Sequence, residues 1–203
     1  MDTKVMQKIS YGLYVLTSAV GGQSNGCIIN TLNQLTSNPL RISVTVNKSN
    51  YTHYVIKNSG SFNVSIIDES ADFSLFKQFG FSSGRDNNKL FKQAYKTSES
   101  GLPYVINGTS SYISCKVINS IDLGTHTMFI ADVIEGEMLS DKPPMTYAFY
   151  HANVKPKPVA KKTDDNTERW VCNICGYIHE GKLPNDFICP ICKHGASDFS
   201  LMK

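Results

Sequence analysis

Four of the six cysteines of this 203-residue chain fall within one short stretch near its C-terminus. They form two Cys-x-x-Cys pairs, Cys172/Cys175 and Cys189/Cys192, separated by thirteen residues. Two such turns offer four thiolates, which can close a tetrahedral shell around one metal ion. The stretch 169–203 is too short to fold on a hydrophobic core alone, so a metal ion would supply much of its stability. The spacing therefore predicts a small metal-binding domain at 169–203.

Spacing alone leaves the metal open, because tetrahedral sulfur suits both iron and zinc. A disulfide framework is a third alternative, and a reducing compartment argues against it. We expect a cytoplasmic location, because the N-terminal stretch lacks the pattern of a signal peptide and no apolar run approaches transmembrane length. In that setting Cys27 and Cys115 are interpreted as small buried apolar residues.

Charge narrows the range of partners. The formal net charge is +3, and basic and acidic residues are nearly balanced along the whole chain. Without a dominant basic face, we expect no nucleic-acid partner, and the absence of a long apolar run predicts no membrane insertion.

Residues 1–151 are predicted to form a mainly β domain. Some segments alternate apolar and polar residues, and others are rich in aromatic and β-branched residues as strands covered on both faces would be. The strand candidates are 11–20, 40–46, 62–66, 113–117 and 127–134. Short helices are expected at about 52–59 and 70–80, each ending at a glycine. Strands outnumber helices, which favours a closed or nearly closed antiparallel barrel with helical insertions.

The composition changes over residues 152–168. This stretch holds two prolines, many charges and almost no large apolar side chains. Such a segment cannot bury enough apolar surface to order itself, so it is predicted to be a flexible linker that tethers the cysteine-rich domain.

The residues around the cysteines point to an electron-transfer metal. Gly176 and Tyr177 follow the first pair, and Pro190 makes the second pair Cys-Pro-x-Cys. Aromatic residues flank both pairs: Trp170, Phe187 and Phe199. A dry aromatic shell tunes a redox metal, whereas a structural zinc has less use for it.

This pattern resembles the rubredoxins, and its short gap is similar to that of the module appended to rubrerythrins. The resemblance covers about residues 169–203 and implies one iron ion bound by Cys172, Cys175, Cys189 and Cys192. Lys193 stands where rubredoxins usually carry glycine, a departure that removes no ligand.

Two stretches of the first domain are rich in hydrogen-bond donors. Residues 25–39 are expected to form a loop whose amide and hydroxyl groups could bind a planar, polar-edged ligand. Residues 47–53 open a helix, and a helix N-terminus favours anions such as phosphate. The alternative is that Asn50 or Thr52 merely caps that helix.

Six motifs, in order, resemble the flavin reductase-like family, whose fold is the FMN-binding split barrel. They are the segments at 11–18, 25–39, 48–53, 83–86 with Lys89, 124–127 and 144–147. The resemblance implies a homodimer that binds FMN. It also implies that the flavin ring and ribityl chain lie against Asn30, Thr31 and Thr36, and that the phosphate is held by Ser49, Asn50 and Thr52 beside Lys48.

The same resemblance places His126 at the open face of the flavin, where nicotinamide stacks in members that accept hydride. Thr125 stands where an aspartate is often found before that histidine, and Ala131 replaces a glycine shortly after it. No Gly-x-Gly-x-x-Gly dinucleotide fingerprint is present, so the sequence does not choose between NADH and NADPH.

The two domains together resemble the high-molecular-weight rubredoxins. A flavin accepts a hydride and gives up single electrons, which a one-iron centre can take. The resemblance implies a relay from NAD(P)H through FMN to iron, and on to a redox partner such as a flavodiiron protein that reduces oxygen or nitric oxide. Two alternatives stay open: a flavin reductase that releases reduced FMN and carries a zinc ribbon for interactions, and a carrier whose flavin another protein reduces.

Overall fold

The computed structural model describes residues 5, 8–81, 84, 89–90, 94–156, 168–173, 177–189 and 195–202. The chain divides into two compact units, 1–154 and 155–203. The first unit extends three residues beyond the predicted boundary at residue 151. It does so because the π-helix η2 (Tyr150–Val154) continues there and Val154 packs against the core of this unit. Most of the predicted linker, 157–167, lies outside the described residues.

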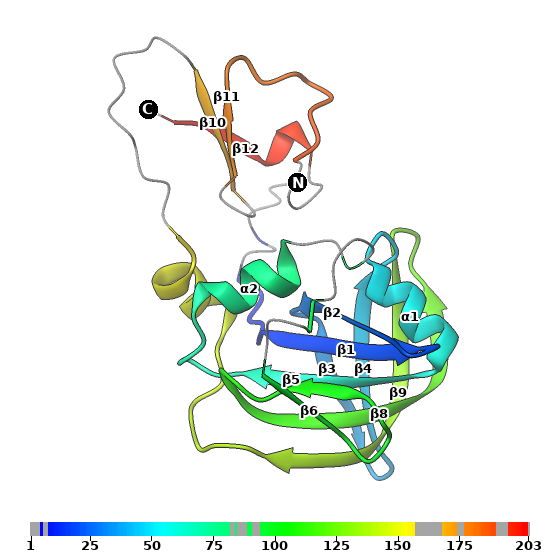
Figure 1. The fold of residues 1–203 in the computed structure, drawn as a ribbon. Helices are drawn as coiled ribbons and strands as arrows, with labels where there is room; N and C mark the ends of the chain where they lie inside the picture. Colours follow the sequence, from blue (N-terminus) through cyan, green and yellow to red (C-terminus); the bar gives the residue numbers. More distant parts are fainter. Residues whose placement is uncertain are drawn as a thin grey trace. The chain divides into compact units, whose positions relative to one another are not determined.

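The first unit is built on one antiparallel sheet of seven strands. Their order across the sheet is β2-β1-β5-β8-β9-β4-β3, and in Figure 1 the sheet curls round on itself. Their bounds are β1 (Tyr14–Val20), β2 (Gln23–Ile29), β3 (Leu32–Ser37), β4 (Leu40–Asn47), β5 (Ser61–Ile67), β8 (Thr109–Asp122) and β9 (His126–Met138). A separate hairpin pairs β6 (Tyr95–Thr97) with β7 (Pro103–Val105). All five predicted strands are confirmed, and β8 and β9 run well beyond the predicted ends.

Curling of the sheet creates one core inside the barrel and a second outside it. The inner cluster joins residues from both ends of the sheet, such as Cys27 on β2 and Val44 on β4. Leu16 belongs to this inner cluster, whereas its neighbour Val15 belongs to the outer cluster. Strand β1 is therefore buried on both faces, as the sequence predicts.

Two helices pack beside β1 and β2 (Figure 1). Helix α1 (Tyr51–Ser59) ends at Gly60, whose φ of 68° is the left-handed conformation that favours glycine. Helix α2 (Phe73–Gly80) begins at Phe73 rather than at the predicted Ser70. The reason is local, because Asp72 accepts a hydrogen bond from the backbone N–H of Ser74 and caps the helix there.

Residues 25–39 are not the loop that was expected. They form the second half of β2 and all of β3, which pairs with β4. The amide and hydroxyl residues are compatible with strands because β3 is largely exposed and because Asn25 and Thr31 make internal hydrogen bonds. A polar stretch at a sheet edge therefore carries no clear strand signal.

The first unit closes with α3 (Tyr147–Phe149) and η2, and the second unit has its own small sheet. That sheet has the order β11-β10-β12. Its strands are β10 (Arg169–Cys172), β11 (Ile178–Glu180) and β12 (Phe199–Leu201), and the 3-10 helix η3 (Ala196–Asp198) precedes the last of them. No helix within the described part of the chain is long and apolar enough to cross a membrane.

Candidate functional site

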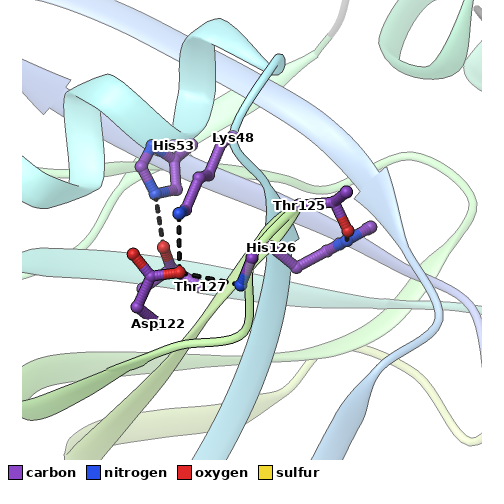
Figure 2. Close-up of polar contacts among 7 residues, drawn as sticks. Lys48, His53, Asp122, Thr125, His126 and Thr127 are labelled. Carbon is purple, nitrogen blue, oxygen red and sulfur yellow. Dashed lines mark hydrogen bonds and ion pairs between the residues drawn. The ribbon is translucent and has the colours of Figure 1, made fainter.

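Two turns that lie far apart in the sequence meet at one end of the barrel. Asn47 at the end of β4 pairs with His126 at the start of β9. The backbone N–H of Lys48 donates to the carbonyl oxygen of Thr125 at 3.0 Å. The ammonium group of Lys48 lies 2.6 Å from Asp122, as Figure 2 shows. Two predicted site residues, Lys48 and His126, are thus brought onto adjoining turns.

Asp122 organises this turn. Its Oδ1 accepts hydrogen bonds from the Lys48 ammonium and from the backbone N–H of Gly124. The Lys48 hydrogen bond, followed by that of Gly124, lowers the pKa of the carboxyl below its ordinary value. Asp122 is largely exposed, so the contact sets the direction of the lysine more than it stabilises the fold. Sequence reasoning missed Asp122, because 74 residues separate it from Lys48.

The imidazole of His126 is half-buried, and Thr125 fixes one of its nitrogens. Thr125 Oγ1 lies 2.8 Å from His126 Nδ1 (Figure 2). The threonine that replaces the expected aspartate therefore still contacts the ring, without a negative charge. With Nδ1 engaged, Nε2 is the nitrogen that remains to face a ligand.

A second histidine supports the same end of the barrel from inside. His53 Nε2 lies 2.8 Å from Thr127 Oγ1 (Figure 2), and its ring packs 5.5 Å from that of Phe129. Burial, followed by the charges of Lys57 and Lys48, lowers the pKa of His53. No local pattern in the sequence indicates this role of His53.

Thr31 immediately precedes β3 and contacts Thr45 on the neighbouring strand β4. Its hydroxyl donates to the carbonyl oxygen of Thr45 at 2.7 Å and accepts from the N–H of the same residue at 3.3 Å. Thr45 pairs with Met128, which lies two residues along β9 from His126. The register therefore places Thr31 on the part of the sheet that leads to His126, and half-buried Asn30 precedes it.

Thr36 is not brought to this place. It pairs with Arg41 near the β3–β4 turn, where its hydroxyl donates to the carbonyl oxygen of Pro39. Arg41 and Asn47 are six residues apart on β4, a separation of about 20 Å along a strand. Within one chain, Thr36 and His126 are thus at opposite ends of the sheet.

The residues expected to hold a phosphate have different environments. Ser49 is exposed, and its N–H donates to Asn47 Oδ1 at 2.9 Å. Asn50 occupies the N-cap position of α1 but makes no side-chain cap hydrogen bond. Thr52 is only 1% exposed, and its hydroxyl donates to Asn25 Oδ1. The Thr52 hydroxyl is thus directed into the protein, whereas Lys48 and Ser49 lie at the surface.

A buried lysine joins β2 to α2. Lys89 is 4% exposed, and its ammonium donates to the carbonyl oxygens of Gly26 and Phe79. Burial lowers the pKa of Lys89. Among the described residues, no carboxylate forms an ion pair with its ammonium group. The neighbouring motif residues Ser83, Arg85 and Asp86 lie outside the described residues.

In the second unit, two predicted metal ligands are described. Cys172 and Cys189 are fully buried. The N–H of Cys172 donates to the carbonyl oxygen of Tyr177 at 2.8 Å, which closes the turn after the first cysteine. Ile188 pairs with Gly195 across the second turn. Cys175 and Cys192 lie outside the described residues, so the structure gives no geometry for a complete four-sulfur shell.

Aromatic rings cluster beside these cysteines. Phe199 pairs with Cys172 across β10 and β12, and its ring lies 5.4 Å from that of Phe187. Phe187 in turn contacts Tyr177 and His179. Two buried cysteines and an adjacent aromatic cluster together fit a sulfur-ligated metal shielded from water.

Known protein families match both units. Residues 6–156 match the flavin reductase like domain, and residues 170–200 match the rubrerythrin, rubredoxin-like domain. The chain is similar to the high molecular weight rubredoxin of Moorella thermoacetica, at 35% identity over 98% of this chain and 99% of that protein. It is also similar to the ferric-chelate reductase (NAD(P)H) of Archaeoglobus fulgidus, at 40% identity over 77% of this chain and 93% of that protein.

Solved structures share the fold of the first unit. The flavin reductase HpaC complexed with NADP+ is 26% identical, with a TM-score of 0.62, over 71% of this chain and 89% of that chain. The nitrilotriacetate monooxygenase component B homologue from Mycobacterium thermoresistibile is 21% identical, with a TM-score of 0.64, over 80% of this chain and 90% of that chain.

Proposed function

This chain belongs to the high-molecular-weight rubredoxin family, and from that premise we propose that it relays electrons from NAD(P)H through FMN to a four-cysteine iron centre. It is an electron-transfer oxidoreductase in which a rubredoxin-like domain follows a flavin reductase-like domain along the chain. The observation that carries the proposal is the joining of these two domains in one chain. FMN would supply the step between a hydride donor and a one-electron acceptor.

The first unit would bind and orient both nucleotides. Thr31 and Asn30 would lie against the flavin, and Lys48 and Ser49 would face its phosphate. Thr36 would not reach this flavin within the same chain, because it lies at the opposite end of the sheet. His126, held through Nδ1 by Thr125, would present Nε2 at the open face where NAD(P)H stacks. NADP+ in the HpaC structure supports a nicotinamide donor, and the name of the Archaeoglobus relative does so as well.

The second unit would hold the iron between Cys172, Cys175, Cys189 and Cys192. The electrons balance when one NAD(P)H loses a hydride, two ferric centres become ferrous and one proton is released. The acceptor of these electrons would be a redox protein, and a flavodiiron protein in the cytoplasm is our specific proposal.

We also propose a homodimer. Large apolar side chains are exposed on β3, β4 and the β8–β9 turn, among them Leu35, Leu40, Ile121 and Leu123. A second copy would cover such a surface. Sedimentation of the full chain should give twice the mass of one chain, and a stable monomer would contradict the dimer.

Metal and flavin analysis of protein prepared without air tests the relay. We expect one iron per chain, bound FMN, and rapid bleaching of the flavin when NADH or NADPH is added. Zinc with weakly bound flavin would instead support a reductase that releases reduced FMN. Iron and FMN without bleaching by either nucleotide would support a carrier reduced by another protein.

A further inference from the structure

The middle of β2 contacts two parts of the chain, the first turn of α1 and the residues Gly84 and Lys89. Asn25 and Cys27 are 2% and 3% exposed, and both side chains interact with Thr52 in the first turn of α1. Helix α1 packs on β1 and β2. The residues that would meet a phosphate, Lys48 and Ser49, immediately precede this turn.

Asn25 joins this helix to a second segment. Its Oδ1 accepts a hydrogen bond from Thr52 Oγ1 at 2.8 Å, and its Nδ2 donates to the carbonyl oxygen of Gly84 at 3.0 Å. The oxygen and the nitrogen of the buried Asn25 amide therefore link Thr52 to Gly84, which lie 27 and 59 positions from Asn25 in the sequence. A buried amide left without these partners would be costly, so the arrangement is specified by hydrogen bonding as well as by packing.

Gly84 approaches Asn25 so closely that no side chain fits between them. A Cβ added to Gly84 would lie 1.9 Å from Asn25 Nδ2. This glycine is needed for close approach rather than for a left-handed backbone, since it is not among the glycines with a positive φ. The contact can therefore be disturbed from the Gly84 side without changing Asn25 or Thr52.

Lys89 fixes the far end of the same segment. Its ammonium donates to the Gly26 carbonyl oxygen at 3.0 Å, and the carbonyl oxygen of Lys89 accepts a hydrogen bond from Gln78 Nε2 at 2.7 Å. Gly84 and Lys89 are thus both attached to β2, at Asn25 and at Gly26 respectively. A buried ammonium that donates to carbonyl oxygens also favours a negative charge nearby.

We propose that Asn25 and Thr52 are positioning residues for the FMN phosphate. They set the first turn of α1 at a fixed place relative to Gly84, and the surface residues that precede this turn, Lys48 and Ser49, then meet the phosphate in the right geometry. Thr52 acts through Asn25 and not as a direct ligand, because its hydroxyl is buried and engaged there. The proposal rests on the proposed function, since it requires that this turn binds FMN.

The test compares FMN with riboflavin, which has the same ring system and lacks the phosphate. The full-length chain is stripped of flavin and titrated with each compound, with flavin fluorescence as the readout. Thr52→Val keeps the shape of the side chain and removes its hydroxyl. We expect it to weaken FMN binding about tenfold and riboflavin binding less than about twofold, because misplaced phosphate contacts affect FMN alone.

Three further variants make the result specific. Thr52→Ser retains the hydroxyl and should restore FMN affinity to near that of the natural chain. Gly84→Ala displaces Asn25 from the other side and should reduce the preference for FMN as Thr52→Val does. Thr109→Val is the matched control, because Thr109 is also buried and its hydroxyl donates to Val105 within another part of the barrel.

The outcomes separate the inference from the function on which it rests. If Thr52→Val and Gly84→Ala weaken FMN and riboflavin equally, or weaken neither, the two residues are only structural and the inference is wrong. If the natural chain itself binds riboflavin as tightly as FMN, the phosphate assignment fails and the inference falls with it. If Thr52→Val does not fold, the ratio of FMN affinity to riboflavin affinity in Gly84→Ala and in Thr52→Ser decides between these outcomes.

Discussion

The two units of this chain bury different kinds of side chain. The first unit contains two contiguous apolar clusters, one inside the barrel and one outside it. In the second unit, the buried apolar residues within the described part are Cys172, Cys189 and Phe199. The first unit can therefore fold by apolar burial, whereas the second depends on what its cysteines bind. A flavin would therefore bind to a preformed first unit, whereas a metal ion would contribute to the folding of the second unit.

The largest expected effect follows from removing one metal ligand. Cys189→Ser should abolish iron binding and unfold the second unit, because a metal ion that builds a small domain contributes much of its folding free energy, about 10–16 kcal/mol for zinc in zinc-finger peptides. FMN binding by the first unit should not change. Iron content and NMR signal dispersion of the second unit measure the result.

The matched control for this variant is a buried cysteine of the barrel. Cys115 is fully buried and burial raises its pKa to about 12, so it is an inert apolar residue. Cys115→Ala should retain the full iron content. A Cys189→Ser protein that still holds one iron per chain would contradict the expectation that iron binding and folding of the second unit depend on this cysteine.

The core of the first unit is the next place to test the contrast. Phe62 is fully buried in the inner cluster. Phe62→Ala should cost about 3–5 kcal/mol of the free energy of unfolding of this unit. In a denaturant titration, the transition seen by flavin fluorescence should move to lower concentration, and the one seen by iron absorbance should not. A common shift of both transitions would mean that the units do not unfold independently.

A smaller effect is expected at the candidate hydride site. His126→Ala should slow flavin reduction by NAD(P)H roughly 10- to 100-fold, because the donor loses a group that orients it. The affinity for FMN should change little. Anaerobic stopped-flow mixing gives the rate, and a flavin titration gives the affinity. Unchanged reduction kinetics would argue that His126 does not meet the donor.

The smallest effect concerns pH. Burial, with Lys57 and Lys48 nearby, lowers the pKa of His53, while Asp122 acts in the opposite sense. The unfolded chain therefore takes up a proton at higher pH than the folded one. Stability from this group is full above about pH 6.5 and is lost as the pH falls through the lowered value. Thermal unfolding of the first unit should depend less on pH in His53→Gln, and an identical pH dependence in both proteins would contradict the assignment.

Much of the fold follows from local patterns in the sequence. The alternation in 40–46 and the glycine at the end of α1 led to the right elements, because these signals act between near neighbours. The mainly β fold with a flavin reductase-like first unit and a rubredoxin-like second unit is confirmed. The stretch 25–39 was misread as a loop, since its polar side chains include the exposed ones of β3 and Asn25 on β2, which is hydrogen-bonded inside the protein.

The site was less predictable, because its contacts join residues far apart in the chain. Lys48 and His126 could be named from resemblance, but nothing local indicates that Asp122 holds the lysine. Likewise, Asn25 and Thr52 looked like donors for a ligand, whereas their side chains bond to each other inside the protein. The buried or exposed state of a polar residue depends on tertiary packing, which no short pattern records.

The most direct test of the relay is to follow both colours in one mixing experiment. Full-length protein loaded with FMN and ferric iron is mixed without air with NADH or NADPH in a stopped-flow instrument. The flavin should bleach first, and the ferric iron should then lose its colour at a rate that does not depend on protein concentration, because the electrons pass within one assembly. An iron centre that keeps its ferric colour while the flavin is fully reduced would contradict the relay.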